Sequence, residues 1–329
     1  MKISPKTRAI FFIISNFFLI LILAIFYYLL LPIKSNSVVY IPQGSVGQII
    51  TYLNNNHYNM SKIDKYILFL LGHPQSGWIN IGTKPLNKVE FLHKLTVAKA
   101  ALESITLIPG ETTIIFLEQL ANQLNLNKEK LLAEYKKQAE FEEGMLYPET
   151  YKIPKGITEP LLIYFLLKHS ENTYKKIAMH YLTLDDLKSR KWREIIIAAS
   201  VVQKEAANND EMQMVASVIY NRLRKGMKLQ MDGTLNYGIY SHTKVTPERI
   251  RQDNSYYNTY KFEGFPKEAV CNVSINAIRA VIFEKRFFDK NKKGSSDYLY
   301  FMRDKQSGKH IFSTNLNDHN KAIDLQKGK

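Results

Sequence analysis

An unbroken apolar run near the N-terminus is the first pattern along the chain. Residues 9–31, AIFFIISNFFLILILAIFYYLLL, carry no formal charge, and as a helix they would span about 35 Å, enough to cross a bilayer. Lys2, Lys6 and Arg8 precede the run and only Lys34 closely follows it, so the positive-inside rule predicts a cytoplasmic N-terminus with the remaining chain outside. Because no small-x-small cleavage site ends the run, we expect an uncleaved single-pass anchor in the inner (plasma) membrane.

Downstream of this anchor, short apolar runs alternate with amphipathic stretches. Three segments each predict a strand, a turn and a helix, and Ser45 with Gln48 forms a capping-box pattern at the first helix. The predicted strands are 38–41, 79–81 and 105–108, and the predicted helices run from 45 to about 54, from 86 to 95 and from 113 to 124. The spacing is irregular, so the pattern indicates a degenerate internal repeat rather than a solenoid. It predicts a small α/β module.

A helical period marks residues 192–205. The expected apolar face of this helix consists of Ile196, Ile197, Ala198, Val201 and Val202. Glu205 falls on the same face, because the apolar residues three, four and seven positions before it point the same way. Burial there would raise the pKa of its carboxyl group and suit it to general acid catalysis near neutral pH. The alternative is an ordinary helix-terminal residue near a core, solvated or paired with Lys204 or an asparagine.

A second helix follows, and Asn208 with Glu211 predicts its start by a capping box. Gly226 is well placed as its C-terminal cap. Its expected inner side consists of Val215, Val218, Ile219 and Arg222. The two helices should pack as a hairpin below the acid. The next segment, 229–238 with sequence LQMDGTLNYG, combines amide, hydroxyl, carboxylate and aromatic groups, a mixture that suits a sugar.

Two more segments complete the pattern. Residues 143–156, EGMLYPETYKIPKG, alternate apolar and polar positions between prolines and a glycine, which predicts a short hairpin with a second carboxylate at Glu149. Residues 161–182 predict a helix, and we interpret its His169 as a surface or core residue rather than a ligand. The combination of short strands and longer helices predicts an α+β fold.

The net charge of +15 needs a partner class that attracts a dispersed positive field: nucleic acid, anionic lipid headgroups or an acidic polymer such as a cell wall. The lysines are scattered and accompany no finger, RRM or helix-turn-helix pattern, which argues against nucleic acid. The eight histidines are dispersed and no HExxH or CxxC pattern exists, so we expect no metal and no cofactor. Cys271 is the single cysteine and is interpreted as a buried apolar residue.

Several of these segments together resemble a known family. The run ASVVQKEAANNDEMQMVASVIYNRLRKGMKLQMDGTLNYG, with YNTY, GFP and the late FSTNLNDHN, is similar to the YceG-like family of endolytic murein transglycosylases. The similarity covers nearly all of the chain beyond the membrane segment. It implies a LysM-like module at 32–100, which would either bind glycan or only pack against the catalytic domain. It also implies a mixed α+β catalytic domain at 101–329, after a cytoplasmic N-terminus at 1–8 and the anchor at 9–31. Peptidoglycan strands would be the substrate, with cell-wall synthases as neighbouring partners.

The resemblance also implies a site. Relatives can carry Glu-Lys-Glu in the acid motif, but the first of these positions is Gln203 here, so Glu205 is the expected catalytic carboxyl group. Relatives commonly place Asp-Pro-Thr where this chain has a glycine, Gly233, between its Asp and Thr. The expected substrate-binding residues are Glu149, Gln230, Asp232, Thr234, Asn236, Tyr237, Tyr257, Asn258 and Tyr260.

The chemistry of such an enzyme needs only one carboxyl group. A lytic transglycosylase cleaves the bond from N-acetylmuramic acid to N-acetylglucosamine without water, because the muramic 6-hydroxyl attacks its own anomeric carbon and leaves a 1,6-anhydro end. Glu205 could serve as acid and then as base. Two alternatives stay open: a hydrolytic muramidase, in which Asp232 or Glu149 activates water, and a non-enzymatic, membrane-anchored scaffold that only binds the cell wall.

Overall fold

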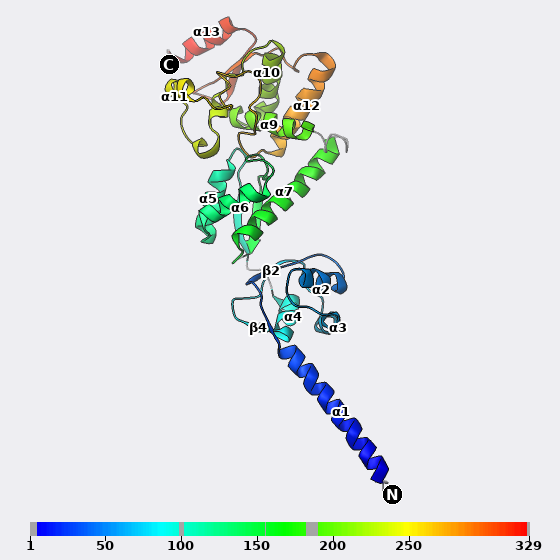
Figure 1. Cartoon of the computed structure of the whole chain (residues 1–329). Helices are drawn as coiled ribbons and strands as arrows, with labels where there is room; N and C mark the ends of the chain where they lie inside the picture. Colours follow the sequence, from blue (N-terminus) through cyan, green and yellow to red (C-terminus); the bar gives the residue numbers. More distant parts are fainter. Residues whose placement is uncertain (1–4, 99–101, 155, 182–189, 328–329) are drawn as a thin grey trace. The chain divides into compact units, whose positions relative to one another are not determined.

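The structure of the protein is a computed structural model that describes residues 5–98, 102–154, 156–181 and 190–327. It divides into two compact units: unit 1 comprises Met1–Ser104 and Lys152–Ile157, and unit 2 comprises Ile105–Tyr151 and Thr158–Lys329. Helices and two-stranded antiparallel sheets occur in both units (Figure 1), which confirms the expected mixed α+β class.

Unit 1 begins with one long apolar helix. Helix α1 spans Pro5–Leu30, and its segment Ile10–Leu30 is long and apolar enough to cross a membrane by length and composition. Large apolar side chains such as Phe11 and Phe26 are exposed along it, as expected of a helix whose natural surroundings are apolar. The helix agrees with the predicted run at 9–31, whereas its placement in a membrane stays a prediction.

A strand pair with two intervening helices forms the centre of unit 1. Strand β2 (Val38–Ile41) pairs antiparallel with β3 (Gly77–Asn80), and α2 (Val46–Asn55) and α3 (Lys62–Leu71) lie between them in sequence. The aliphatic faces of these elements share a core. Its fully buried members include Ile41, Leu53, Leu68, Ile81, Phe91, Leu92 and Leu95.

A second strand pair lies beside this core. Strand β1 (Pro32–Ile33) pairs with β4 (Leu86–Asn87), which leads directly into α4 (Lys88–Val97). The predicted helix at 86–95 is therefore correct in place, although its first two residues pair as a strand. Asn87 caps α4 by accepting from the Glu90 N–H at 2.9 Å.

The local capping signals decide where α2 and α3 begin. Ser45 accepts from the Gln48 N–H while the Gln48 side chain accepts from the Ser45 N–H, which confirms the predicted capping box. Ser61 and Asp64 form the same reciprocal pair at the start of α3. This second box and its helix were absent from the sequence-based assignment, because the helix does not show a polar outer face.

The predicted hairpin at 143–156 is wrong. Strand β6 (Thr150–Pro154) pairs instead with β5 (Leu102–Thr106), far earlier in the chain, and the hydroxyl groups of Thr106 and Thr150 lie 2.9 Å apart. The division between the two units falls within both strands. The order predicted three times, a strand followed by a helix, does occur: β2 precedes α2, β3 precedes α4, and β5 precedes the helix at Thr113–Leu124. The strands pair as β2 with β3 and β5 with β6. Alternation identifies a strand but not its partner.

Unit 2 is mainly helical, and an apolar core lies among α9, α10 and α12, which pack together. These helices lie near one another in Figure 1. Its helices are α5 (Thr113–Leu124), α6 (Lys128–Gln138), α7 (Glu159–Tyr181), α9 (Arg190–Glu205), α10 (Met212–Arg224), α11 (Pro247–Gln252), α12 (Ile275–Asn291) and α13 (Leu316–Lys327), with 3₁₀ turns η1 (Asn209–Glu211), η2 (Asp232–Leu235) and η3 (Gly238–Tyr240). Strands β7 (Tyr300–Arg303) and β8 (His310–Ser313) pair antiparallel.

The turn between α9 and α10 differs in one detail from the predicted capping box. Asn208 accepts from the Glu211 N–H at 3.2 Å, as expected. The Glu211 carboxylate, however, accepts from the backbone N–H of His310 at 3.0 Å and lies 2.8 Å from its ring Nδ1. The Glu211 carboxylate therefore binds His310 of β8, whereas the local pattern predicted that it would cap the helix. At the other end of α10, Gly226 has a φ of +64°, which fits its predicted capping role.

Candidate active site around Glu205

Glu205 is the last residue of α9. The residues that were expected to share its face, Ala198, Val201 and Val202, are all buried, because α9 packs against both α10 and α12. Glu205 itself is only partly buried. A carboxyl group is thus held over an apolar surface while it keeps contact with the outside, and that is the arrangement the helical spacing predicted.

The two preceding side chains point to other partners. The Gln203 side chain accepts from the Ser274 N–H at the start of α12, and Lys204 donates to the Ser241 hydroxyl at 2.9 Å. Neither side chain is therefore committed to neutralising Glu205. The alternative in which Lys204 pairs with Glu205 is not what the structure contains.

Within the described part of the chain, one backbone group bonds to the Glu205 carboxylate. Glu205 Oε1 accepts from the Gly233 N–H at 2.6 Å. Burial raises the pKa of Glu205 to about 7; the bond from Gly233 acts against this, the charge of Asp232 adds to it, and Arg222 opposes it. A substantial fraction of the carboxyl groups therefore carries a proton near neutral pH, as a general acid requires.

Gly233 owes its identity to this close approach. A Cβ at this position would lie 2.7 Å from Glu205 Oε1, 2.7 Å from the Lys204 Cβ and 3.1 Å from the Lys204 backbone carbon. A proline at this position would have no N–H to donate. The glycine therefore gives this chain a direct backbone bond to its candidate acid, and the loop that it occupies is fixed against α9.

Arg222 of α10 stabilises the loop around Gly233. This buried guanidinium donates to the backbone oxygens of Leu229 and Leu299. Arg222 thus joins the start of the loop to the segment before β7. Its position on the inner side of α10 was predicted, and the structure shows that it serves the loop as well as the core.

Three of the predicted substrate-binding residues lie on the outside of this loop. Asp232 is exposed and accepts from the Tyr260 hydroxyl at 2.6 Å. Gln230 is also exposed, with a φ of +50°, a left-handed conformation that is uncommon for a residue with a side chain. Gln230 and Tyr260 belong to two adjoining segments, which are joined by the bond from the Gln230 N–H to the Thr259 carbonyl oxygen.

Asn236 and Tyr237 follow at the end of η2, where both are partly buried. The Tyr237 hydroxyl donates to Asp253 at 3.1 Å, and its ring stacks on Tyr257 with centroids 4.2 Å apart. With its amide oriented to satisfy its neighbours, Asn236 donates to the Thr243 carbonyl oxygen at 2.9 Å. Their faces are available at the surface, but part of their polar capacity is already used.

Three other predicted residues lie behind the surface. Thr234 and Asn258 are fully buried, and Tyr257 is nearly so. The Thr234 hydroxyl donates to the Met231 carbonyl oxygen, and the Asn258 amide donates to the carbonyl oxygens of Ile250 and Asp253. These side chains hold the loops in place, so burial favours a supporting role over the direct sugar contact that the sequence suggested.

Glu149 is placed differently. Its carboxylate lies against the ring of His169 of α7, and its backbone oxygen accepts from the Leu107 N–H. The histidine that was interpreted as a plain surface or core residue is therefore the partner of the second carboxylate. These contacts of Glu149 are therefore with His169 of α7 and with Leu107, which follows β5. Neither partner belongs to the loop around Gly233.

Two further carboxylates were not among the predicted site residues. Glu111, before α5, pairs with His242 at 2.7 Å; burial acts to raise its pKa, but bonds from Thr112 and His242 together hold it below the usual value. The Thr112 hydroxyl donates to the Gly238 carbonyl oxygen. Glu111 and Thr112, at the start of α5, therefore both bond to residues of the segment 238–242. The partners lie more than a hundred residues apart, and no local pattern announces them.

Glu143 is the other. It is buried at the start of α5, where its carboxylate accepts from the Thr113 N–H at 2.9 Å, the Thr113 hydroxyl and the Gly144 N–H. Burial raises its pKa to about 7, against the effect of these bonds. It lines a cavity of about 670 Å³ together with Tyr237 and Tyr257, two of the predicted substrate-binding residues.

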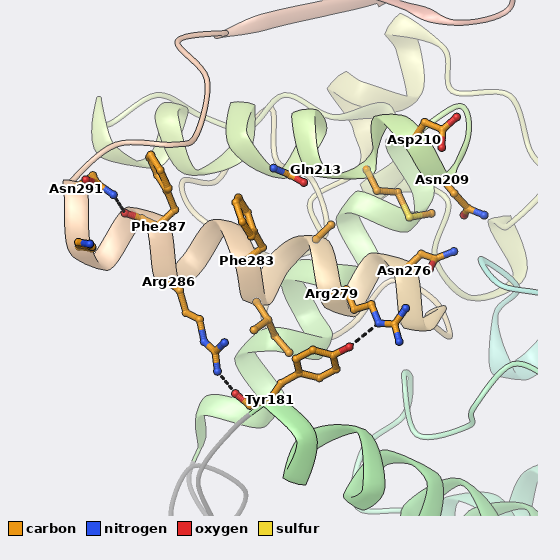
Figure 2. A pocket seen from close by; sticks show the side chains of 14 residues that line it. Tyr181, Asn209, Asp210, Gln213, Asn276, Arg279, Phe283, Arg286, Phe287 and Asn291 are labelled. Carbon is orange, nitrogen blue, oxygen red and sulfur yellow. Dashed lines mark hydrogen bonds between the residues drawn. The ribbon is translucent and has the colours of Figure 1, made fainter.

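A second cavity, of about 1000 Å³, lies along α12. Figure 2 shows Arg279 and Arg286 reaching from this helix toward Tyr181: Arg279 donates to the Tyr181 hydroxyl at 2.6 Å and Arg286 to its backbone oxygen. Both arginines are thus engaged within the protein. Across the described ranges, no group of three or more His, Cys, Asp and Glu residues is arranged to hold a metal ion.

Comparison with known proteins gives consistent matches. The model of the YceG-like family matches residues 39–325. Endolytic murein transglycosylases of Streptococcus pneumoniae (strain R6) and Bacillus subtilis (strain 168) are 31% and 28% identical to this chain over 186 and 190 residues. Each match covers 55% of this chain, but 31% of the first protein and 46% of the second. The chain therefore matches less than half the length of these curated relatives.

A solved structure adds the fold. A protein described as yceG-like from Listeria monocytogenes aligns with a TM-score of 0.55 at 26% identity, covering 88% of this chain and 99% of that chain. The sequence match and the structural match thus point to the same family.

Proposed function

Since the chain belongs to the YceG-like family, we propose that it is an endolytic lytic transglycosylase of peptidoglycan. It would cleave the bond from N-acetylmuramic acid to N-acetylglucosamine in nascent glycan strands and so end their elongation. The observation that carries the proposal is Glu205: a partly buried carboxyl group with a pKa of about 7, held by one backbone N–H beside a loop of polar and aromatic side chains.

Glu205 performs both proton transfers in this mechanism. Its Oε1 accepts from Gly233, so we assign the transferred proton to Oε2. The O–H donates to the glycosidic oxygen as the bond to the anomeric carbon breaks, and the muramic 6-hydroxyl forms the new bond to that carbon. The carboxylate then accepts the hydroxyl proton and is restored as the acid. No water is consumed, and no second carboxylate is needed.

The substrate contacts that we propose are the accessible residues of the loop. Gln230 and Asp232 are exposed, and Tyr260 is partly exposed where it bonds to Asp232. Asn236 and Tyr237, both partly exposed, follow in the same loop. Asp232 would orient sugar hydroxyls and balance positive charge that develops at the anomeric carbon. The aromatic rings would cover the apolar face of a pyranose. The buried residues Thr234, Tyr257 and Asn258 would support these residues. Glu149 lies against His169 instead.

The membrane and glycan assignments extend this proposal. Helix α1 would anchor the chain in the plasma membrane with residues 1–8 in the cytoplasm and the catalytic domain, 101–329, outside. The LysM-like module at 32–100 would hold glycan near the site, and cell-wall synthases that supply nascent strands would work nearby. The cationic surface that accompanies the net charge of +15 suits both anionic lipid and an acidic wall polymer.

Mass spectrometry of digested glycan strands tests the proposal. The full-length protein in lipid nanodiscs should produce 1,6-anhydro ends, which are lighter by one water than the reducing ends that a muramidase leaves. Reducing ends would replace the proposal with hydrolysis and direct attention to Asp232 or Glu149 as the group that activates water. Strand binding with no new ends of either kind would support the non-enzymatic scaffold.

A further inference from the structure

Helix α3 exposes apolar side chains where a surface helix normally exposes polar ones. The exposed fractions are 58% for Ile63, 67% for Tyr66, 69% for Phe69 and 85% for Leu70. These positions are spaced by three, three and one residues, so they lie on one face of the helix. We call this set the α3 stripe.

Helix α2 of the same unit gives the contrast. Both helices have ten residues and both begin with a capping box. The exposed positions of α2 include Thr51, Asn54 and Asn55, the polar outer face that is usual for a helix packed on a core. The apolar outer face of α3 is therefore a local feature and not a general property of the unit. A contiguous exposed apolar face of this kind marks an interaction surface.

The first turn of α3 is tied to the last turn of the apolar helix α1. The Tyr28 hydroxyl lies 2.5 Å from the Ser61 hydroxyl and donates to Asp64 at 2.9 Å. Lys88 forms a buried ion pair with Asp64 at 3.1 Å and donates to the Tyr28 hydroxyl at 2.9 Å. Its ammonium group also lies 4.2 Å from the Tyr28 ring centroid. Because Asp64 and Lys88 are almost completely buried, this junction is part of the core of unit 1.

This junction sets the depth of α3. Tyr28 lies inside the apolar segment Ile10–Leu30, about 3 Å of helix rise before its end. If that segment crosses the bilayer, the headgroup layer begins where α1 ends and is roughly 5 to 8 Å thick. The reach of one tyrosine side chain therefore brings Ser61, and with it the start of α3, to the level of the headgroups. Figure 1 shows α3 at the end of unit 1 from which α1 emerges.

We propose that α3 is a second membrane contact, an interfacial helix that inserts the α3 stripe into the outer surface of the bilayer. The proposal rests on the membrane anchoring of α1. Lys62 and Lys65 are exposed on the same helix, and their long side chains suit anionic headgroups while the apolar residues enter the acyl boundary. Tyr66 is a residue type that favours this interface.

A second membrane contact would restrict the orientation of unit 1. A unit held by α1 alone can rotate about the helix axis and tilt, whereas α3 adds a contact to one side of that axis. Together with the buried Tyr28, Asp64 and Lys88 junction, it fixes the orientation of unit 1 relative to the membrane plane. Any glycan held by this unit would then be presented in a defined direction.

Depth measurement by spin labelling tests the proposal in the full-length chain. A nitroxide is placed at Leu70→Cys in a Cys271→Ala background, and the protein is reconstituted in nanodiscs that contain anionic lipid. Collision with oxygen, which concentrates in the acyl region, should exceed collision with a water-soluble nickel complex at position 70. Asn55→Cys on α2 is the matched control in the same unit and should show the opposite ratio.

A third label at Leu21→Cys, within α1, separates the two proposals. An acyl-type ratio at 21 with an aqueous ratio at 70 overturns the interfacial role of α3 and leaves the anchor intact. An aqueous ratio at 21 overturns the anchor, and α3 with it. Dipolar broadening between labels at position 70 would show that a second copy of the chain, rather than lipid, covers the α3 stripe.

Discussion

Glu205 and Glu143 are two carboxyl groups of unit 2 whose pKa values burial raises to the same value, about 7. Their surroundings differ in every other respect. Glu143 is almost completely buried and accepts from two groups of Thr113 and from Gly144. Glu205 is partly buried and, among the residues that the structure describes, accepts from the Gly233 N–H alone. A raised pKa therefore does not distinguish a catalytic acid from a structural carboxylate.

The two groups differ in whether a carboxylate oxygen remains available to a bound molecule. Both oxygens of Glu143 are occupied at the first turn of α5, where the N-cap Thr112 makes no side-chain cap bond, so Glu143 acts as the acceptor for that helix end. Glu205 keeps one oxygen outside its single bond and has access to the surface. Proton transfer to a bound molecule requires that access, and we infer catalysis at 205 and support of α5 at 143.

The largest effect should follow from Glu205→Gln. Glutamine keeps the size of the side chain and an oxygen for the Gly233 bond, but it cannot donate the transferred proton. General acid–base catalysis contributes about 10² to 10⁴ in rate. One group serves both transfers in the proposed mechanism, so the loss should reach the upper end of that range or exceed it. The measurement is the rate of anhydro-end formation with the protein in nanodiscs.

Controls for this variant come from the other carboxylates of the predicted site. Glu149→Gln and Asp232→Asn should each lose less activity, because neither side chain carries the transferred proton. Retention of more than roughly a tenth of wild-type activity by Glu205→Gln would be below the usual contribution of a general acid, and the assignment would then fail.

Alanine at the two positions should separate stability from activity. Glu143→Ala leaves the N–H and the hydroxyl of Thr113 without their acceptor in a buried place, which should lower the free energy of unfolding by about 2 to 3 kcal/mol. Glu205→Ala removes the acceptor of one N–H near the surface, at a cost of about 1 kcal/mol or less. Thermal unfolding of the two variants at pH 7 measures the difference.

Activity provides the opposite ranking. Glu143→Ala should retain turnover at temperatures where it stays folded, whereas Glu205→Ala should be inactive at all temperatures. Equal losses of stability, or an inactive but fully folded Glu143→Ala, would contradict the division of roles between these carboxylates.

The sequence predicted what depends on neighbours along the chain. The period of α9 placed Glu205 on the apolar face, and Ser45 with Gln48 identified the start of α2, because helical spacing and capping are local. The pattern at 143–156 correctly suggested a strand but not its partner β5. Glu211 likewise matched a local capping box, yet His310 takes its carboxylate. A local rule cannot foresee a stronger partner that the fold brings from elsewhere.

Long-range pairing also explains the residues that were missed. Glu143 meets Thr113 across 30 positions of sequence, and Glu111 meets His242 across 131, with no motif to connect them. Conversely, Thr234, Tyr257 and Asn258 have the composition of a sugar site, but burial assigns them to the support of the loops. Residue type predicted the region of the site, and only the fold decides which of these side chains reach the surface.

The smallest expected effect is a shift in pH dependence that reports the charge next to Glu205. Because the acid must be protonated, kcat/KM should fall as the pH rises through about 7. The negative charge of Asp232 helps to raise the pKa of Glu205, so Asp232→Asn should lower that pKa and move the alkaline limb to lower pH, by roughly half a pH unit. Asparagine retains an oxygen for the Tyr260 hydroxyl, which keeps the loop in place. Asp253→Asn is the matched control, since this carboxylate accepts from Tyr237 and from the Ser255 N–H instead. A limb that stays in place or moves to higher pH in Asp232→Asn would show that the limb belongs to a group other than Glu205.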